Sequence, residues 1–174
     1  MRLTSPSFAD GANLPYDCAY EGGNSSPALA WTVAPSGSVS LALTCVDTDA
    51  PFQKFWVHWL AWNIPAWETR RLVGQLPYAR LEDGTEQGLN DFLEFGWGGP
   101  CPPSGTHRYV FTLYALDSML KPDGPGIQDL FQAMEGHVIE AAELAACYAP
   151  DGAIVSYEAI AREGRAKFRY SRTA

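Results

Sequence analysis

The chain has 174 residues, of which 47% are hydrophobic and 18% charged, a composition that fits one compact domain rather than a fibrous or disordered chain. Its formal net charge of −8 at pH 7 disfavours nonspecific attraction to nucleic acid or to an anionic membrane. No apolar run reaches the roughly 20 residues of a membrane helix, and the N-terminus lacks the layout of a signal peptide. We therefore expect a soluble, cytoplasmic protein with no nucleic-acid partner and at most a peripheral contact with membranes.

Three β-rich runs cover residues 41–46, 55–64 and 108–116. A tight acidic loop, residues 47–51, follows the first run. Residues 74–105, between the second and third runs, contain few long apolar runs. So long a loop inside a compact domain is usually functional or packed on itself.

The run at residues 55–64 carries apolar side chains on both faces, which predicts a central strand. Its one ionisable residue is His58. Strict alternation assigns one set of side chains to each face: Trp56, His58, Leu60 and Trp62 to one, and Phe55, Val57, Trp59 and Ala61 to the other.

Helical spacing of apolar residues predicts two amphipathic helices after the strands. The first carries Ile127, Leu130, Phe131 and Met134, and the second carries Val138, Ala141, Leu144, Ala145 and Tyr148. Strands first and helices afterwards predict a mainly β, antiparallel fold of two packed sheets, a β-sandwich with C-terminal helices.

Residues 1–149 form the predicted domain, and residues 150–174 form a C-terminal extension. The extension is basic, with five basic residues against one acidic residue in 162–174. Residues 166–171 alternate in the manner of a strand. We expect the extension to pack on its own domain or on a partner.

The cysteines are scattered without a Cys-x-x-Cys pair, which argues against a structural zinc site and for free thiols in a reducing compartment: Cys18, Cys45, Cys101 and Cys147. Cys45 lies in a predicted strand and is expected in the core. Cys101, in the loop before His107, is the thiol that a Cys–His nucleophile would use.

His58 has two interpretations. It can be a core histidine whose ring is satisfied by one carboxylate or carbonyl, or its ring can be oriented by Asp47 so that the other ring nitrogen meets a ligand. Asp47 and Asp49 together are either turn formers or, with the histidines, ligands of a transition metal. The calcium-loop pattern fails, because the glycine and the final glutamate are missing at the required offsets.

The glycines before the third strand offer backbone N–H groups that can approach an anion closely, namely Gly98, Gly99 and Gly105. The prolines among them stiffen the loop but offer no donor. A small anion cradle is therefore predicted, but not a P-loop, because the Gly-Lys-Ser/Thr element is absent.

Four motifs occur in order: Ser26-Pro27-Ala28-Leu29-Ala30-Trp31, Asp47-Thr48-Asp49-Ala50-Pro51, Trp56-Val57-His58-Trp59 with Asn63-Ile64-Pro65, and Gly99-Pro100-Cys101-Pro102-Pro103-Ser104-Gly105-Thr106-His107-Arg108-Tyr109. Over residues 1–148 this set resembles the phosphatidylethanolamine-binding protein family, and more narrowly its bacterial Raf kinase inhibitor-like members. The resemblance implies a β-sandwich of one large and one smaller sheet, with a small pocket for phosphate-like anions and phospholipid head groups.

The resemblance also implies ligand-binding residues: Asp47, Asp49 and Pro51 of the acidic loop, Trp56 and His58 of the strand, Gly99, Pro100 and Cys101 of the pocket loop, and His107 and Tyr109. Two departures from the family pattern bear on the pocket. Thr48 replaces a proline, and residues 93–95 replace a stretch that contains glycine.

Three functions follow. The first is a non-catalytic binding protein for a phosphate-containing or carboxylate ligand, with no cofactor and no metal. The alternative is a regulatory protein that inhibits a kinase or protease through a surface contact. A phosphoesterase or hydrolase, with His58 or His107 as general base and Asp47 as its orienter, is less well supported because no nucleophile is evident. By analogy with the relatives, we expect a homodimer.

Overall fold

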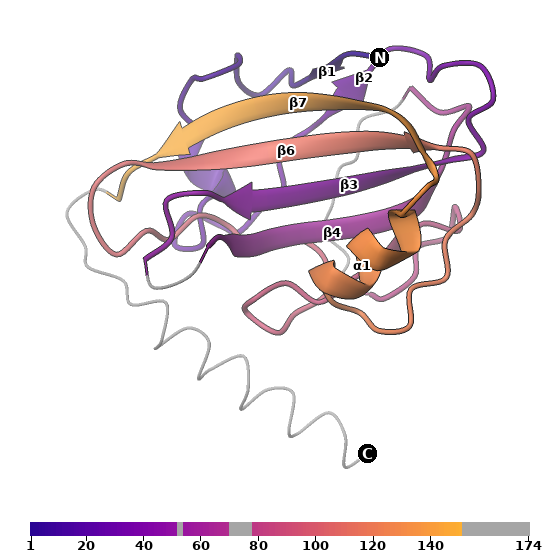
Figure 1. The fold of residues 1–174 in the computed structure, drawn as a ribbon. Coiled ribbons are helices and arrows are strands. Elements are labelled where there is room, and N and C mark those ends of the chain that lie inside the picture. The colour runs from indigo at the N-terminus through magenta and orange to yellow at the C-terminus, as the bar shows by residue number, and fades with distance from the viewer. Residues whose placement is uncertain (52–53, 70–77, 151–174) are drawn as a thin grey trace.

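A five-stranded antiparallel sheet, in the order β5-β4-β3-β6-β7, forms the framework of the molecule (Figure 1). The structure is a computed structural model that describes residues 1–51, 54–69 and 78–150. The strands are β3 (Ser40–Asp47), β4 (Trp56–Pro65), β5 (Glu86–Gln87), β6 (His107–Leu116) and β7 (Val138–Tyr148). The three runs predicted as strands are β3, β4 and β6, and the mainly β fold is confirmed.

Elements on both faces of this sheet bury its side chains. Helix α1 (Ile127–Met134), which confirms the first predicted helix, lies over one face and buries Leu130 and Met134 there (Figure 1). A two-stranded sheet of β1 (Leu3–Thr4) and β2 (Ala30–Trp31) packs on the other face. A short 3-10 helix, η1 (Tyr16–Cys18), precedes β2. The larger core cluster lies between the two sheets and includes Leu3, Trp31, Leu41, Leu43, Cys45, Trp59, Phe111 and Leu113.

The second predicted helix is wrong, because residues 138–148 form strand β7. The strand pairs with β6 from Val138 opposite Leu116 to Tyr148 opposite His107. Its even-numbered side chains Ala142, Leu144, Ala146 and Tyr148 pack in or against the core, whereas Ala141 and Glu143 are exposed. The alanines and glutamates of this segment favour a helix locally, but pairing with β6 overrides that preference.

A β-bulge at His58 changes the faces that alternation predicted for β4. Cys45 pairs with Trp59 and the next residue, Val46, pairs with Val57, so His58 is an extra residue without a partner in the ladder. Val57 therefore joins the cluster under α1 together with Leu60 and Trp62, while Trp59 and Ala61 face the other core. Both faces of β4 are buried as predicted, but the assignment of residues before the bulge was wrong.

A second irregularity, at Asn63, fixes the loop that follows β6. Asn63 has a left-handed backbone, with φ of 57°, beside a shift in the pairing of β3 and β4. Its side-chain N–H donates to the carbonyl of Leu120 at 3.0 Å, and its side-chain oxygen accepts from the Leu120 N–H at 2.8 Å. The buried amide thus links β4 to the segment that leads into α1.

The extension at residues 150–174 lies, except for Pro150, outside the described residues, and so does its strand-like segment. Within the described residues, no helix has the length and apolar character needed to cross a membrane.

Replacing Asn63 with alanine should destabilise the fold by about 2–4 kcal/mol. The substitution removes two buried hydrogen bonds. Alanine also lacks the polar side chain through which asparagine tolerates a left-handed backbone. Urea denaturation at pH 7.5 measures the loss. Asn63→Gly removes the same hydrogen bonds but tolerates the backbone angle, so it should be less destabilising than Asn63→Ala. Equal stability of the wild type and Asn63→Ala would contradict this account.

Candidate functional site

The predicted site residues meet at the end of the sheet where β3 ends and where β4 and β6 begin. In the register of the three strands, Asp47 pairs with Trp56 on one side and with Tyr109 on the other. All three therefore form one row across the sheet, at the tip of the β3 arrow in Figure 1. Asp47 and Tyr109 are fully buried, and Trp56 is half-buried.

His58 is held by a reciprocal pair of hydrogen bonds with Gly98. Its Nδ1 lies 2.5 Å from the Gly98 carbonyl, and the Gly98 N–H donates to the His58 carbonyl at 2.8 Å. The ring lies among three aromatic rings, with centroid distances of 5.5 Å to Phe92, 6.2 Å to Trp97 and 5.0 Å to Tyr109. Sequence alone left two partners open for this ring, and the structure assigns a carbonyl.

The second ring nitrogen of His58, Nε2, is buried and has no hydrogen-bond partner within the described part of the chain. Burial lowers the pKa of the ring to about 4, and this outweighs the opposite influence of the Gly98 and Gly99 backbone and of Asp47. The imidazole is therefore neutral at pH 7. A buried polar atom without a partner costs free energy, which a ligand that pairs with it would recover.

Asp47 orients His107 rather than His58. Its Oδ2 lies 2.7 Å from Nδ1 of His107, and its Oδ1 accepts from the Asp49 N–H at 2.9 Å. Asp49 in turn accepts from the Arg108 N–H at 2.8 Å. The Thr48 N–H donates to the Arg108 carbonyl at 3.0 Å, a bond that a proline at this position lacks. The acidic loop is thereby fastened to the start of β6, and the expected Asp47–His58 hydrogen bond is not formed.

The loop of residues 97–101 is held by the segment after η1. The Gly99 N–H donates to the Asn24 side chain at 2.6 Å, and the Trp97 indole N–H donates to the Cys18 carbonyl at 3.1 Å. A Cβ at Gly99 would lie 2.4 Å from that same carbonyl, so only glycine permits this approach. The Gly98 and Gly99 amides are both engaged within the chain, so of the three glycines of the predicted anion cradle these two donate inside the protein, and Gly105 is exposed.

Residues 90–96 form a compact turn, which includes residues 93–95, the departure from the family pattern that was expected to bear on the pocket. The Asn90 side chain accepts from the N–H groups of Phe92 and Glu94, and it donates to the Gly96 carbonyl at 3.1 Å. Leu93 has φ of 63°, in the region that favours glycine. The turn places Phe92 against the rings of His58 and Trp56. The local signal for this turn is Asn90, because asparagine is a common turn former.

Two predicted residues lie at the margin of this network. Pro51 is half-buried just before residues 52–53, which lie outside the described residues. Pro100 is buried, and its carbonyl accepts from the Tyr20 N–H at 3.0 Å.

Cys101 is fully buried in the same loop, and its pKa is raised well above the ordinary value, first by burial and then by the charges of Glu21 and Asp47. The thiol is therefore protonated at neutral pH and a poor nucleophile. Within the described residues, no group of three or more His, Cys, Asp or Glu side chains has the arrangement of a metal site.

Comparisons with known proteins find relatives that match this chain over most of its length. A family model described as phosphatidylethanolamine-binding protein matches residues 4–149. A UPF0098 protein from Methanothermobacter thermautotrophicus is 45% identical over 150 residues, which cover 85% of this chain and 98% of that protein. The UPF0098 protein YbhB from Escherichia coli is 42% identical over 125 residues, or 67% of this chain and 78% of the relative.

Two solved structures share the fold. The crystal structure of YbcL from Escherichia coli, described as a member of the mammalian PEBP family, has a TM-score of 0.78 and 34% identity, over 86% of this chain and 98% of that chain. The phosphatidylethanolamine-binding protein homolog CT736 from Chlamydia trachomatis has a TM-score of 0.76 and 34% identity, over 86% of this chain and 97% of that chain.

The buried His58 should make stability depend on pH. Since its pKa is about 4 in the folded chain and about 6.5 when unfolded, the unfolded state binds the proton first on acidification. This contribution is fully present above pH 6.5 and is lost as the pH falls toward 4, by about 2–3 kcal/mol. Urea unfolding at pH 7.5 and 4.5 should show that loss in the wild type and not in His58→Gln. The same loss in both proteins would show that other groups cause it.

The Cys101 thiol should resist alkylation in the folded protein. At pH 8 we expect iodoacetamide to leave Cys101 unmodified, as read by mass spectrometry of its peptide, because the thiolate is disfavoured by burial and by neighbouring carboxylates. In urea all four cysteines should react. Rapid modification of native Cys101 would reopen the Cys–His hypothesis.

Proposed function

This chain belongs to the phosphatidylethanolamine-binding protein family, and from that premise we propose that it is a non-catalytic binding protein for a small ligand with a phosphoryl group. The ligand would occupy the end of the sheet at Asp47, His58, His107 and Tyr109, beside the 97–101 loop.

The observation that carries this proposal is the unpartnered Nε2 of His58. A histidine that served only the core would have both ring nitrogens satisfied, or one of them facing water. Here the ring is fixed by Gly98 and by three aromatic neighbours, while Nε2 is buried and finds no partner among the residues that the structure describes. A fixed polar atom with an unused lone pair or proton is what a preorganised binding site presents to a ligand.

The chemistry of the same residues supports binding over catalysis. The Cys101 thiol is held protonated by burial, with a raised pKa, and is therefore a weak nucleophile. The pKa of about 4 makes His58 a weak general base at neutral pH. Asp47 is already shared between His107 and the Asp49 amide. None of these groups is arranged as a nucleophile activated by a base.

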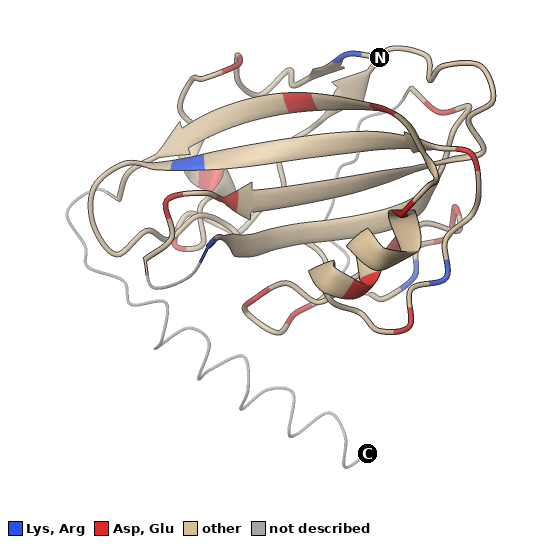
Figure 2. Cartoon of the chain, viewed as in Figure 1, with Lys and Arg blue, Asp and Glu red and all other residues tan. Residues whose placement is uncertain are grey.

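The inhibitor function, a homodimer and a cytoplasmic location stay predictions. The basic extension on which a protein contact would depend lies almost wholly outside the described residues. In the described part of the chain, acidic residues outnumber basic ones (Figure 2).

Titration with phosphoethanolamine should shift the side-chain NMR signals of His58 and His107 in a saturable manner at millimolar concentration. The variant His58→Asn keeps an amide that can donate to Gly98 but has no atom in the place of Nε2, so it should bind about tenfold or more weakly. Isothermal titration calorimetry measures the affinity.

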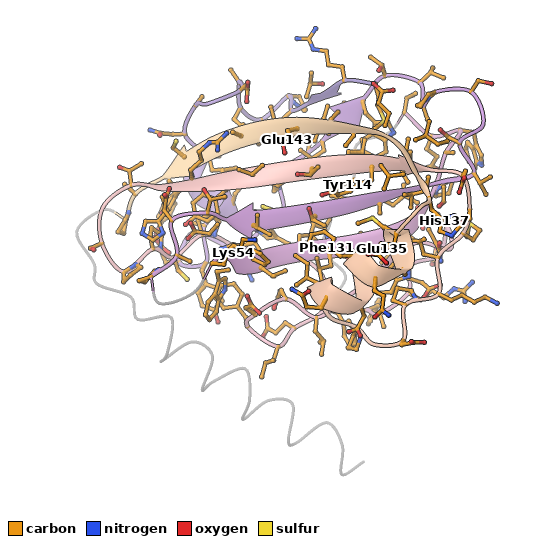
Figure 3. The ribbon with its side chains drawn as sticks, viewed as in Figure 1. Lys54, Tyr114, Phe131, Glu135, His137 and Glu143 are labelled. Carbon is orange, nitrogen blue, oxygen red and sulfur yellow. The ribbon has the colours of Figure 1, made fainter. Side chains whose placement is uncertain are left out.

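His137→Asn is the matched control. His137 is an exposed histidine that precedes β7 and contacts Asp117, at the end of the sheet away from Asp47 (Figure 3). This variant should bind like the wild type. Absence of any saturable shift with phosphoethanolamine or phosphate would refute the proposed function, and equal loss in both variants would mean that the site lies elsewhere.

A further inference from the structure

We propose that His58 serves the ligand as a hydrogen-bond acceptor, so that the site selects a phosphoryl group that carries a proton over an oxyanion that carries none. This inference rests on the function proposed above and specifies the class of ligand.

The partner of Nδ1 determines which ring nitrogen carries the hydrogen. A carbonyl oxygen only accepts hydrogen bonds, so Nδ1 must donate to Gly98 across the 2.5 Å contact. In a neutral imidazole the other nitrogen then has a lone pair and no hydrogen. Nε2, the buried atom without a partner, is therefore an acceptor in the resting site.

The surroundings of the ring keep it neutral. Phe92 and Trp97 offer uncharged faces, and the Gly98 carbonyl is already used by Nδ1. The backbone of Gly98 and Gly99 and the Asp47 carboxylate on β3 favour a charged ring, His107 on β6 disfavours it, and burial outweighs the groups that favour charge. Two further titratable groups nearby are Tyr109, whose ring is 5.0 Å away, and Cys101, whose thiol is protonated because its pKa is raised.

An oxyanion without a proton would bind weakly at this site. Its oxygen would face the Nε2 lone pair, acceptor against acceptor, in a region that already holds the Asp47 carboxylate. A phosphate monoester loses its second proton at a pKa of about 6, so near pH 6 it still carries a hydroxyl that can donate to Nε2. Sulfate and carboxylates are fully ionised there and have no such hydrogen to donate.

The bound state then contains one proton between a phosphoryl oxygen and Nε2. Below pH 6 the ligand brings that proton, and at higher pH it must be taken up from solution when the dianion binds. Phosphoryl affinity should therefore fall as the pH rises above about 6, by up to tenfold per pH unit.

The decisive experiment compares inorganic phosphate with sulfate, which have the same tetrahedral shape, on the full-length protein at pH 6 by isothermal titration calorimetry. We expect phosphate to bind about 10- to 100-fold more tightly than sulfate, because sulfate leaves Nε2 unpaired. Calorimetry at pH 8 in buffers of different ionisation enthalpy should show uptake of protons on binding phosphate.

A variant tests the role of the ring nitrogen itself. Glutamine at position 58 places an amide near the former Nε2, and this amide can turn its N–H₂ toward a ligand. His58→Gln should therefore bind sulfate and phosphate with similar affinities, whereas the control His137→Gln should discriminate like the wild type. In the wild type without ligand, the ¹⁵N shift of His58 Nε2 should be that of an unprotonated ring nitrogen. This measurement does not depend on which ligand the protein binds.

The outcomes separate the two proposals. Equal binding of phosphate and sulfate by the wild type would refute the selection of a protonated ligand and leave the proposed function standing. A protonated Nε2 in the ¹⁵N spectrum would overturn the inference directly. If the wild type binds neither anion and no phosphomonoester, the proposed function fails and this inference fails with it.

Discussion

The reciprocal hydrogen bonds between His58 and Gly98 are the constraint on which the candidate site depends. They join strand β4 to the 97–101 loop at both the main chain and the side chain, so the loop cannot move without exposing two buried polar groups. They also fix the tautomer of the ring, because the carbonyl oxygen can only accept. The position of the loop and the tautomer of the imidazole follow from this contact, whereas the neutrality of the ring comes from its burial.

The bulge in β4 makes this contact possible. In a regular ladder His58 would be opposite a residue of β3, and its side chain would follow strict alternation. As the extra residue between Val57 and Trp59, it can turn its ring toward Phe92, Trp97 and Tyr109. Bulges commonly re-aim side chains beside functional sites, and here the bulge allows a histidine to enter an aromatic environment without breaking the sheet.

Asp47 has a separate role at the same end of the sheet. One carboxylate oxygen contacts His107 and the other accepts from the Asp49 amide, so a single side chain joins the end of β3 to the start of β6 and shapes its own loop. The two histidines are thereby held in different ways, one by a carbonyl and one by a carboxylate. The site therefore contains two imidazoles with unlike hydrogen-bond partners.

The sequence by itself determined the elements whose patterns are local. Alternating apolar residues predicted β3, β4 and β6, helical spacing predicted α1, and the ordered motifs predicted which polar residues would gather. It did not determine β7, because the alanines and glutamates of residues 138–148 suit a helix as well as a strand. Only the open edge of β6 decided between the two structures.

The partners within the site were likewise decided by tertiary structure. The sequence placed Asp47 and His58 in adjacent elements and suggested that they form a hydrogen bond. In the structure, His58 lies in a one-residue bulge and its ring bonds to the Gly98 carbonyl, while Asp47 bonds to His107. Asn24 holds the 97–101 loop through a contact 75 residues away in sequence, which no local pattern marks. Composition and periodicity determine which side chains are buried, but hydrogen-bond partners depend on register and on loops distant in sequence, and those are set only when the sheets pack.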